Sequence, residues 1–270
     1  MLDNIDITKI LFFDIETVPN EKHHDDLDET WKELWAHKAG PMVKKIEEDR
    51  KEKLAPKVGK ENKDKKIQES EEVIEKTPAD VYDRAGIYAE FGKIICISVG
   101  GVVKDKVTGM YKAHVKSFAN NDEKQLLEDF STLMKERYSD YNEKNPKYLC
   151  GHNIKEFDVP YISRRLLINS LSLPKMFDLA GKKPWEVTHL IDTMELWKFG
   201  DYKSFTSLKL LAAVLGFPSP KDDIGGADVH RIYYEQNDLP RIAKYCEKDV
   251  IAVMRLLMKY KLMSDELGIS

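Results

Sequence analysis

The segment LFFDIET at residues 11–17 constrains the fold of this chain more than any other. Apolar residues run up to Asp14 and then alternate with polar ones, which is typical of a strand that emerges from a buried core. Strand side chains alternate between faces, so Asp14 and Glu16 lie on one face, about 7 Å apart. Two carboxylates this close repel each other and need a compensating cation, and oxygen ligands favour Mg²⁺ or Mn²⁺ over zinc. A pair of this kind alone is more often a solvated strand end, so the metal-site hypothesis depends on further carboxylates in the chain.

Length and composition allow one substantial hydrophobic core. The 270 residues fit one large domain, or one domain with an elaborated arm. Hydrophobic residues make up 42% of the chain and charged residues 33%, which is above average. The net charge of −4 is not typical of nucleic-acid-binding modules, which are usually basic. It does not exclude such a role, because bound metal ions cancel local acidity.

Cysteine use and the N-terminal sequence indicate the compartment. Cys96, Cys150 and Cys246 are odd in number, fit no zinc-binding spacing and lie in apolar surroundings, so we expect free thiols that fill the core in a reducing cytosol. The N-terminus lacks a signal-peptide pattern, and no apolar run reaches the roughly 18 residues of a membrane span. The sequence therefore predicts a soluble, cytoplasmic protein.

An amphipathic helix is expected after the first strand. Residues 24–38 place Leu27, Trp31, Leu34 and Trp35 at helical spacing with charges between them. We expect the tryptophans to pack on the main domain or on a partner helix. A substrate-stacking or dimer-forming role for them is the alternative.

Almost continuous alternating charge fills residues 44–76. The pattern fits an exposed helix with ion pairs that breaks near Pro56, or a partly disordered segment. Acidic and basic residues balance here, so the segment has little net attraction for a phosphate backbone.

The remaining pattern alternates strands and helices, which predicts an α/β domain with a mixed sheet. The expected strands are residues 94–103, 111–118, 147–150 and 187–191, the last ending at Asp192. The expected helices are one capped by Asn121 or Asp122 that carries Leu126–Met134, one that starts near Asp158, one over 207–215, and one that starts near Leu239.

Two further carboxylates lie where a site can form. Asp158 follows a strand that ends in Gly-His-Asn, and ligands bind at the carboxyl ends of strands in open α/β sheets. Its alternative role is a first-turn charge that matches the helix dipole. Arg164 and Arg165, later in the same helix, are expected on the surface, with phosphate contacts as the alternative. In the last helix, Tyr245 and Asp249 are four residues apart and share one face at the margin of the apolar stripe.

Taken together, these residues resemble the DEDDy class of 3′–5′ exonucleases, which includes the proofreading domains of family B DNA polymerases. DIET at 14–17 resembles the first motif of that class, NIKEFDVPYI at 153–162 the second, and YCEKDV at 245–250 the third.

Two further motifs resemble those of one subgroup within this class. EFGKI at 90–94 and LGFPSPKDD at 215–223 resemble a stand-alone bacterial subgroup described as polymerase-B-like predicted 3′–5′ exonucleases. The resemblance covers residues 8–20 and roughly 77–262, and it leaves the intervening segment unassigned.

The resemblance implies an RNase H-like fold, with a mixed β-sheet flanked by helices. Residues 1–270 are then a single exonuclease domain. Residues 21–76 form a charged, helical insertion within it, through which a homodimer or another protein partner could bind.

The resemblance also implies two divalent metal ions, Mg²⁺ or Mn²⁺, at one site. Asp14 is expected to bridge both ions, and Glu16 and Asp249 to complete the site that holds the attacking water. Asp158 is expected to hold the second ion, largely through water. Tyr245, too weak a base at its usual pKa near 10, is expected to orient that water.

Substrate contacts are expected from Thr17, Asn153 and Phe157. For Phe157, a role as a core aromatic behind Asp158 is an equal alternative. His152 stands beside the site but is not expected to act as the base, because the class uses a tyrosine.

The predicted function is two-metal hydrolysis of phosphodiester bonds at the 3′ end of single-stranded DNA, with release of nucleoside monophosphates, in a process such as DNA repair. One alternative is the same chemistry on RNA or short oligoribonucleotides. Another is a non-catalytic nucleic-acid-binding module.

Overall fold

A mixed β-sheet forms the centre of the protein. A computed structural model describes residues 2–54, 76–139, 145–219, 223–264 and 266–269. Among these residues the sheet has six strands in the order β5-β4-β1-β2-β3-β6. β1 is antiparallel to β2 and parallel to β4, which confirms the mixed sheet. The strands are β1 Ile10–Pro19, β2 Gly92–Lys104, β3 Tyr111–Ala119, β4 Tyr148–Gly151, β5 Leu190–Asp192 and β6 Leu267–Ile269.

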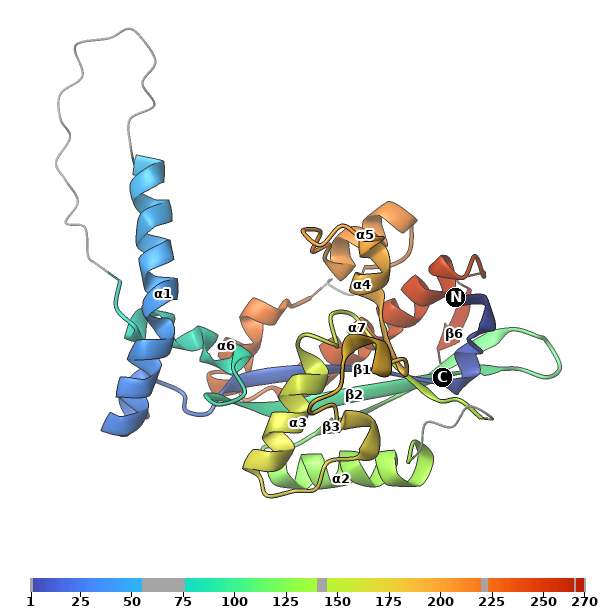
Figure 1. The fold of residues 1–270 in the computed structure, drawn as a ribbon, viewed down its shortest axis with the longest axis horizontal. Coiled ribbons are helices and arrows are strands. Elements are labelled where there is room, and N and C mark those ends of the chain that lie inside the picture. The colour runs from blue at the N-terminus through green and yellow to red at the C-terminus, as the bar shows by residue number, and fades with distance from the viewer. Residues whose placement is uncertain (1, 55–75, 140–144, 220–222, 265, 270) are drawn as a thin grey trace, which may run out of the picture.

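Helices cover both faces of this sheet, as expected for an RNase H-like exonuclease fold (Figure 1). None of the described helices is both long and apolar enough to cross a lipid bilayer. The helices are α1 Glu29–Leu54, α2 Glu123–Arg137, α3 Asp158–Ile168, α4 Thr193–Lys198, α5 Leu208–Leu215, α6 Val229–Tyr234 and α7 Leu239–Tyr260.

β1 lies between two hydrophobic cores, and its alternation decides which side chains reach the site. Leu11 and Phe13 pack in the core formed with α2 and α3. Phe12, on the opposite face, packs in the core formed with α5 and α7. By the same alternation Asp14 and Glu16 lie on the α7 face, as predicted.

α1 begins later and extends further than predicted, because its pattern of charges continues past residue 38. Trp35 is fully buried against the 3₁₀ segment Ala79–Ile87, and its Nε1 donates to the Pro78 carbonyl at 2.7 Å. The Trp31 ring meets Phe91 edge-on at 5.6 Å. Both tryptophans therefore pack on the main body of the protein, as expected.

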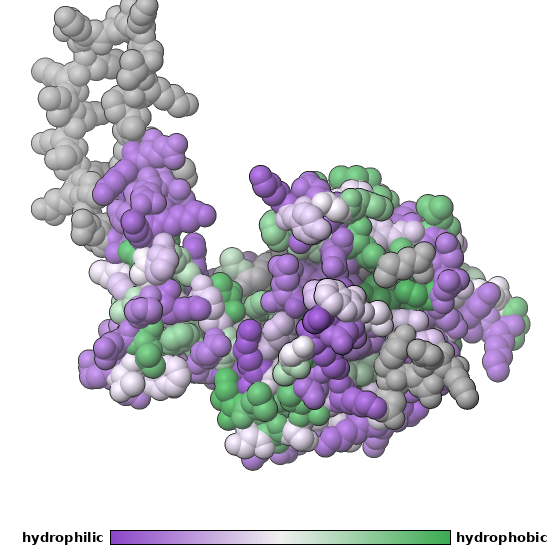
Figure 2. Space-filling model, viewed as in Figure 1, coloured by the Kyte–Doolittle hydropathy of each residue, from purple (hydrophilic) through white to green (hydrophobic). Residues whose placement is uncertain are grey.

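The outer half of α1 is almost entirely hydrophilic (Figure 2). Such a surface fits the predicted exposed helix with ion pairs, among them Lys44–Glu48 at 3.9 Å. Residues 55–75, which hold the rest of the charge run, lie outside the described residues. Association through 21–76 stays a prediction.

Most predicted elements occur close to their expected bounds. β2, β3, β4 and α5 each begin and end within about two residues of the prediction, α7 begins at Leu239 as predicted, and β5 begins three residues later. Ser207 accepts from the backbone of Leu210 at the start of α5, and Gly216 ends it at φ 72°. α4, α6 and β6 were not predicted, since three to six residues carry too little periodicity.

Arg165 is buried, so its predicted surface position is wrong. Its Nε and Nη2 donate to Glu123 at 2.8 and 2.5 Å, and its Nη1 donates to the Ala89 carbonyl at 2.9 Å. Arg165 is four residues beyond Tyr161 and therefore shares its buried helix face. Arg164, one position earlier, is exposed as expected.

We expect Arg165→Met to lower the free energy of unfolding by about 3–5 kcal/mol, because it leaves the Glu123 carboxylate buried without its cation. The double variant with Glu123→Gln should recover most of the loss, since the amide oxygen still accepts from the Ile94 N–H. Urea denaturation followed by circular dichroism measures both. Lys44→Ala, in the exposed pair with Glu48, is the control and should change nothing measurable. A double variant as unstable as the single one would contradict this account.

Candidate active site

The structure brings together the four predicted carboxylates. Asp14 and Glu16 come from β1, Asp158 is the first residue of α3, and Asp249 lies on α7. Glu16, Asp158 and Asp249 are at most 8% exposed, and Asp14 is partly exposed. Burial raises the pKa of Asp14 well above its usual value, and the charges of Asp249, Asp158 and Glu16 raise it further. All four therefore lie within range of each other's charge.

The donor set fits hard divalent cations. Ligand atoms of Asp14, Glu16 and Cys246 lie within 4.8 Å of one another. Carboxylate oxygens predominate at the site, and a cation relieves the repulsion that raises the pKa of Asp14. Asp14 and Glu16 can hold such an ion, and Asp158 and Asp249 are close enough to share in the site.

Asp158 is fixed by its place at the start of α3. Its Oδ1 accepts from the backbone N–H of Ile15 at 3.1 Å, which ties the helix start to β1. Burial raises the pKa of Asp158 to about 7, against the lowering effect of hydrogen bonds from its own N–H and that of Ile15. In neutral solution this carboxyl group is thus close to half protonated when no cation is bound.

Tyr245 remains protonated at any working pH. Burial raises the pKa of its hydroxyl far above its usual value, with further contributions from Glu16, Asp249 and Asp14. The hydroxyl donates to Asp249. Such a group can orient a neighbour by hydrogen bonding but cannot act as a base.

Asp192 shapes the turn that carries Asn153, a role that its sequence context did not reveal. Asn153 adopts a left-handed conformation at φ 69°, which asparagine tolerates. Asp192 accepts from the backbone N–H of Asn153 at 2.9 Å and of Lys155 at 3.1 Å, and it also caps α4. The sequence signal for this role is that Asp192 and Glu195 are three residues apart, which is the spacing of a capping box at a helix start.

His152 has both ring nitrogens engaged, which agrees with its exclusion as a base. Its Nε2 lies 3.0 Å from the Thr206 carbonyl, so it must be the N–H donor. Burial lowers the pKa of His152, and its Nδ1 lies 3.0 Å from the Thr193 hydroxyl, which donates to the Gly151 carbonyl. His152 therefore connects two segments rather than facing a substrate.

Thr17 and Phe157 flank the carboxylates. The Thr17 hydroxyl donates to the Gly86 carbonyl at 2.8 Å. Phe157 is half-buried, and its ring packs against Tyr161 at 5.4 Å. Its packing matches the core-aromatic alternative, while its exposed part stays available to a ligand.

Cys246 is buried as expected but also touches the site, which was not predicted. Its Sγ donates to the Asp14 carbonyl at 3.3 Å and lies 3.5 Å from Asp14 Oδ2. Beneath it, Cys96 Sγ lies 3.6 Å from Ser98 Oγ, which bonds Ser117 Oγ at 2.8 Å. Ser117 in turn donates to Glu247 at 2.9 Å. A polar strip thus extends from Asp14 across β1, β2 and β3 under α7.

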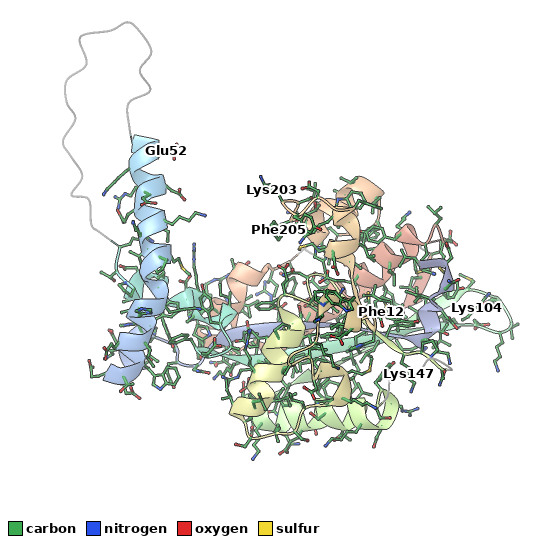
Figure 3. All side chains as sticks on the ribbon, viewed as in Figure 1. Phe12, Glu52, Lys104, Lys147, Lys203 and Phe205 are labelled. Atoms are coloured by element: carbon green, nitrogen blue, oxygen red, sulfur yellow. The ribbon has the colours of Figure 1, made fainter. Side chains whose placement is uncertain are left out.

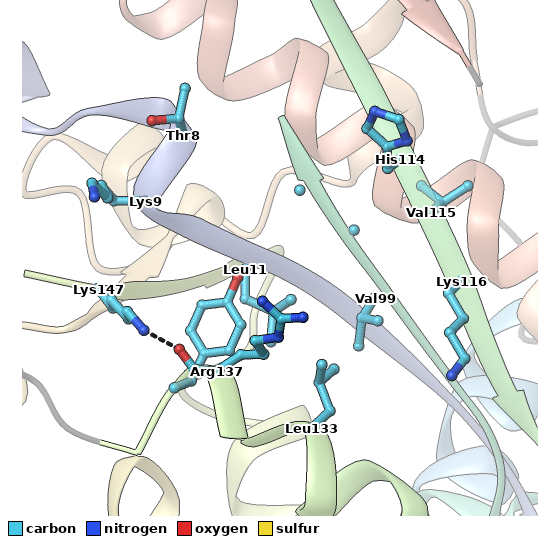
Figure 4. Close-up of a pocket in the computed structure, with 13 residues that line it drawn as sticks. Thr8, Lys9, Leu11, Val99, His114, Val115, Lys116, Leu133, Arg137 and Lys147 are labelled. Carbon is cyan, nitrogen blue, oxygen red and sulfur yellow. Dashed lines mark hydrogen bonds between the residues drawn. The ribbon is translucent and has the colours of Figure 1, made fainter. Parts of the chain in front are cut away.

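A separate cavity of about 420 Å³ lies on the α2 face of the sheet (Figure 4). Leu11 and Val99 form its apolar floor, and Lys9, Arg137 and Lys147 lie around it. Lys147 donates to the Arg137 carbonyl. None of the four carboxylates lines this cavity, so it is not the active site.

Comparison with known proteins places the chain among nucleases. Residues 87–269 match the sequence model of a family described as "Predicted 3'-5' exonuclease related to the exonuclease domain of PolB". The chain is also 27% identical over 173 residues to DNA polymerase 120R of Invertebrate iridescent virus 3. That alignment covers 51% of this chain and 14% of the polymerase, so the chain spans only a small part of that relative's length. β1 precedes the matched residues and joins them through the sheet.

We expect metal to stabilise the protein more at pH 7.5 than at pH 5. The pKa of Asp158 is raised to about 7 in the folded protein, from 3.8 without such burial. The folded state therefore binds a proton that the unfolded state lacks, and this stabilisation is lost as pH rises through about 7. A cation replaces the proton above that pH. Melting temperatures of EDTA-treated protein with and without Mn²⁺ measure the difference.

Asp158→Asn is the matched control, because it is isosteric and cannot titrate. It should reduce the pH dependence of the melting temperature in EDTA. Identical pH dependence in wild type and variant would contradict the assignment.

Proposed function

Because this chain belongs to the family of predicted 3′–5′ exonucleases related to the exonuclease domain of PolB, we propose that it removes nucleoside monophosphates from the 3′ end of single-stranded DNA. The observation that supports this most is the gathering of four carboxylates, Asp14, Glu16, Asp158 and Asp249, beside the Tyr245 hydroxyl. Family membership itself supports nuclease activity and a nucleic-acid substrate.

In this proposal, Asp14, Glu16, Asp158 and Asp249 would hold two divalent cations, Mg²⁺ or Mn²⁺, which when bound would supply an activated water and neutralise charge on the leaving 3′ oxygen. Asp14, the most exposed of the four carboxylates, would contribute to holding both cations. Glu16 and Asp249 complete the position nearer the attacking water. Asp158 contributes to the other, largely through water, since its Oδ1 already accepts from Ile15.

Tyr245 orients the attacking water in this scheme. Its proton is donated to Asp249, so the phenol oxygen presents its remaining lone pairs to a water hydrogen. The raised pKa of the phenol keeps it in this form throughout the reaction.

Asn153, Phe157 and Thr17 hold the terminal nucleotide. The side-chain amide of Asn153 offers hydrogen bonds beside Asp158, and the exposed part of Phe157 offers packing to a base or sugar. The Thr17 hydroxyl proton is engaged with Gly86, so its oxygen can only accept. A terminal 3′-hydroxyl is a donor and complements it.

We expect Asp14→Asn and Asp249→Asn each to lower kcat by about 10³-fold or more, because each removes a charge needed to hold the cations. Neither should destabilise the metal-free protein, since each relieves repulsion within the cluster. Release of a 3′-terminal label from a single-stranded oligonucleotide with Mn²⁺ measures the rate, and chelator should abolish it. Asp129→Asn, exposed on α2, is the control. Unchanged activity in either active-site variant would overturn the assignment.

The same assay separates DNA from RNA. Matched oligodeoxyribonucleotide and oligoribonucleotide substrates differ at the 2′-hydroxyl. Faster hydrolysis of RNA would retain the carboxylate assignment and revise the substrate.

We expect Tyr245→Phe to lower kcat by about 10²-fold with little change in KM, because the variant loses water orientation but no metal ligand. The pH–rate profiles of wild type and variant should have the same shape, since Tyr245 does not titrate. An alkaline limb near pH 10 that disappears in the variant would show that the phenol acts as a base.

A further inference from the structure

Three exposed aromatic side chains occupy the segment that joins α4 to α5. Phe199, Tyr202 and Phe205 are 90%, 87% and 65% exposed. In Figure 3, Lys203 and Phe205 lie on the loop beside α4, well away from the sheet. Large exposed apolar groups clustered in so few residues mark a binding surface rather than ordinary surface composition.

The backbone is left-handed where the aromatic segment begins. α4 ends at Phe199, which adopts a left-handed conformation at φ 45°, and Gly200 follows at φ 90°. A left-handed phenylalanine is uncommon and needs support from its surroundings. The Phe199 and Trp197 rings meet edge to face with centroids 6.4 Å apart, and Trp197 stacks on Tyr260 of α7 with centroids 5.9 Å apart.

The aromatic segment adjoins the turn that carries Asn153. His152 donates to the Thr206 carbonyl at 3.0 Å, which attaches the far end of the segment to that turn. Tyr202 and Asn153 both line one cavity of about 390 Å³. The segment therefore lies close to Asn153, one of the residues proposed above to hold the terminal nucleotide.

Charge around this cavity is largely balanced. Lys198 lies 3.9 Å from Glu156, and Lys155 lies 2.5 Å from Glu195. Lys198 Nζ also lies 4.3 Å from the centre of the Phe205 ring, so it steadies that ring. Stacking rather than net charge is what this surface offers a ligand.

We propose that Phe199, Tyr202 and Phe205 form a stacking platform for the bases of the single strand that precede its 3′-terminal nucleotide. Every base has a π-face, so such a platform binds single strands without reading their sequence. Lys203, exposed on the same loop, can contact the backbone phosphates. The proposal rests on the proposed exonuclease function for the identity of the ligand, and a protein partner or a second copy of the chain is the competing occupant.

The test compares wild type with the variant Phe199→Ala/Tyr202→Ala/Phe205→Ala. KM for a single-stranded 15-mer should rise roughly 10- to 100-fold, since base–aromatic contacts are lost. Hydrolysis of the p-nitrophenyl ester of thymidine 5′-monophosphate, which has no preceding bases, should not change. Unchanged KM for the 15-mer would overturn the platform. An equal fall in kcat/KM with both substrates would also overturn it.

Binding gives a readout that needs no hydrolysis. Anisotropy of a 5′-labelled 15-mer in EDTA should show a 10- to 100-fold weaker Kd for the triple variant, with a shallow dependence of the wild-type Kd on salt. If wild type binds by this surface but hydrolyses nothing, the platform stands and the proposed function fails. A steep salt dependence that is the same in both proteins would overturn the platform.

Matched variants separate stacking from general surface effects. Tyr202→Phe and Phe205→Trp keep an aromatic face and should bind as wild type. Trp185→Ala removes a 70% exposed ring beside Lys183 that does not line this cavity, and it should have no effect. Loss of a wild-type dimer in the triple variant, seen by analytical ultracentrifugation with unchanged binding of the 15-mer, would assign the surface to self-association instead.

Discussion

Repulsion among four carboxylates is the constraint that the rest of the site must satisfy. The charges of Asp249, Asp158 and Glu16 raise the pKa of Asp14. These three carboxylates are nearly inaccessible to solvent. Such a cluster is unfavourable on its own. The fold keeps it because each residue belongs to an element fixed by apolar burial, and β1 packs in hydrophobic cores on both of its faces. Core packing therefore holds the carboxylates in place, and a bound cation would remove the repulsion.

The central strand and the longer elements could be predicted from the sequence because they depend on local periodicity, whereas the carboxylate set was predicted from the resemblance of three motifs to a known family. What escaped prediction depends on contacts between distant residues. Cys246 reaches Asp14 across 232 positions, and nothing near Cys246 indicates that contact. Asp192 organises the Asn153 turn across 39 positions. The case of Arg165 is different, because its helical spacing from buried residues was visible in the sequence. A buried charge needs a partner, however, and only the structure shows that Glu123 faces it.

The continuity of α1 through Pro41 and the short strands were missed for a different reason. α1 continues to Leu54 without an apolar stripe, so its outer half carries no periodic signal, only charges at helical spacing. β6 has three residues and pairs in parallel with β3. Elements of this size are set by what they pair with rather than by their own composition.

Asp192 couples the Asn153 turn to the aromatic segment. Oδ1 of Asp192 accepts from the backbone N–H of Asn153 and from the N–H groups of Met194 and Glu195 in the first turn of α4. The turn and the start of α4 are therefore fixed to the same atom. α4 has six residues, which spans about 9 Å, and it ends at Phe199. At the other end of the aromatic segment, the His152 ring donates a hydrogen bond to the Thr206 carbonyl. The proposed stacking platform and the proposed terminal-nucleotide site are thereby held at a fixed separation by a short helix.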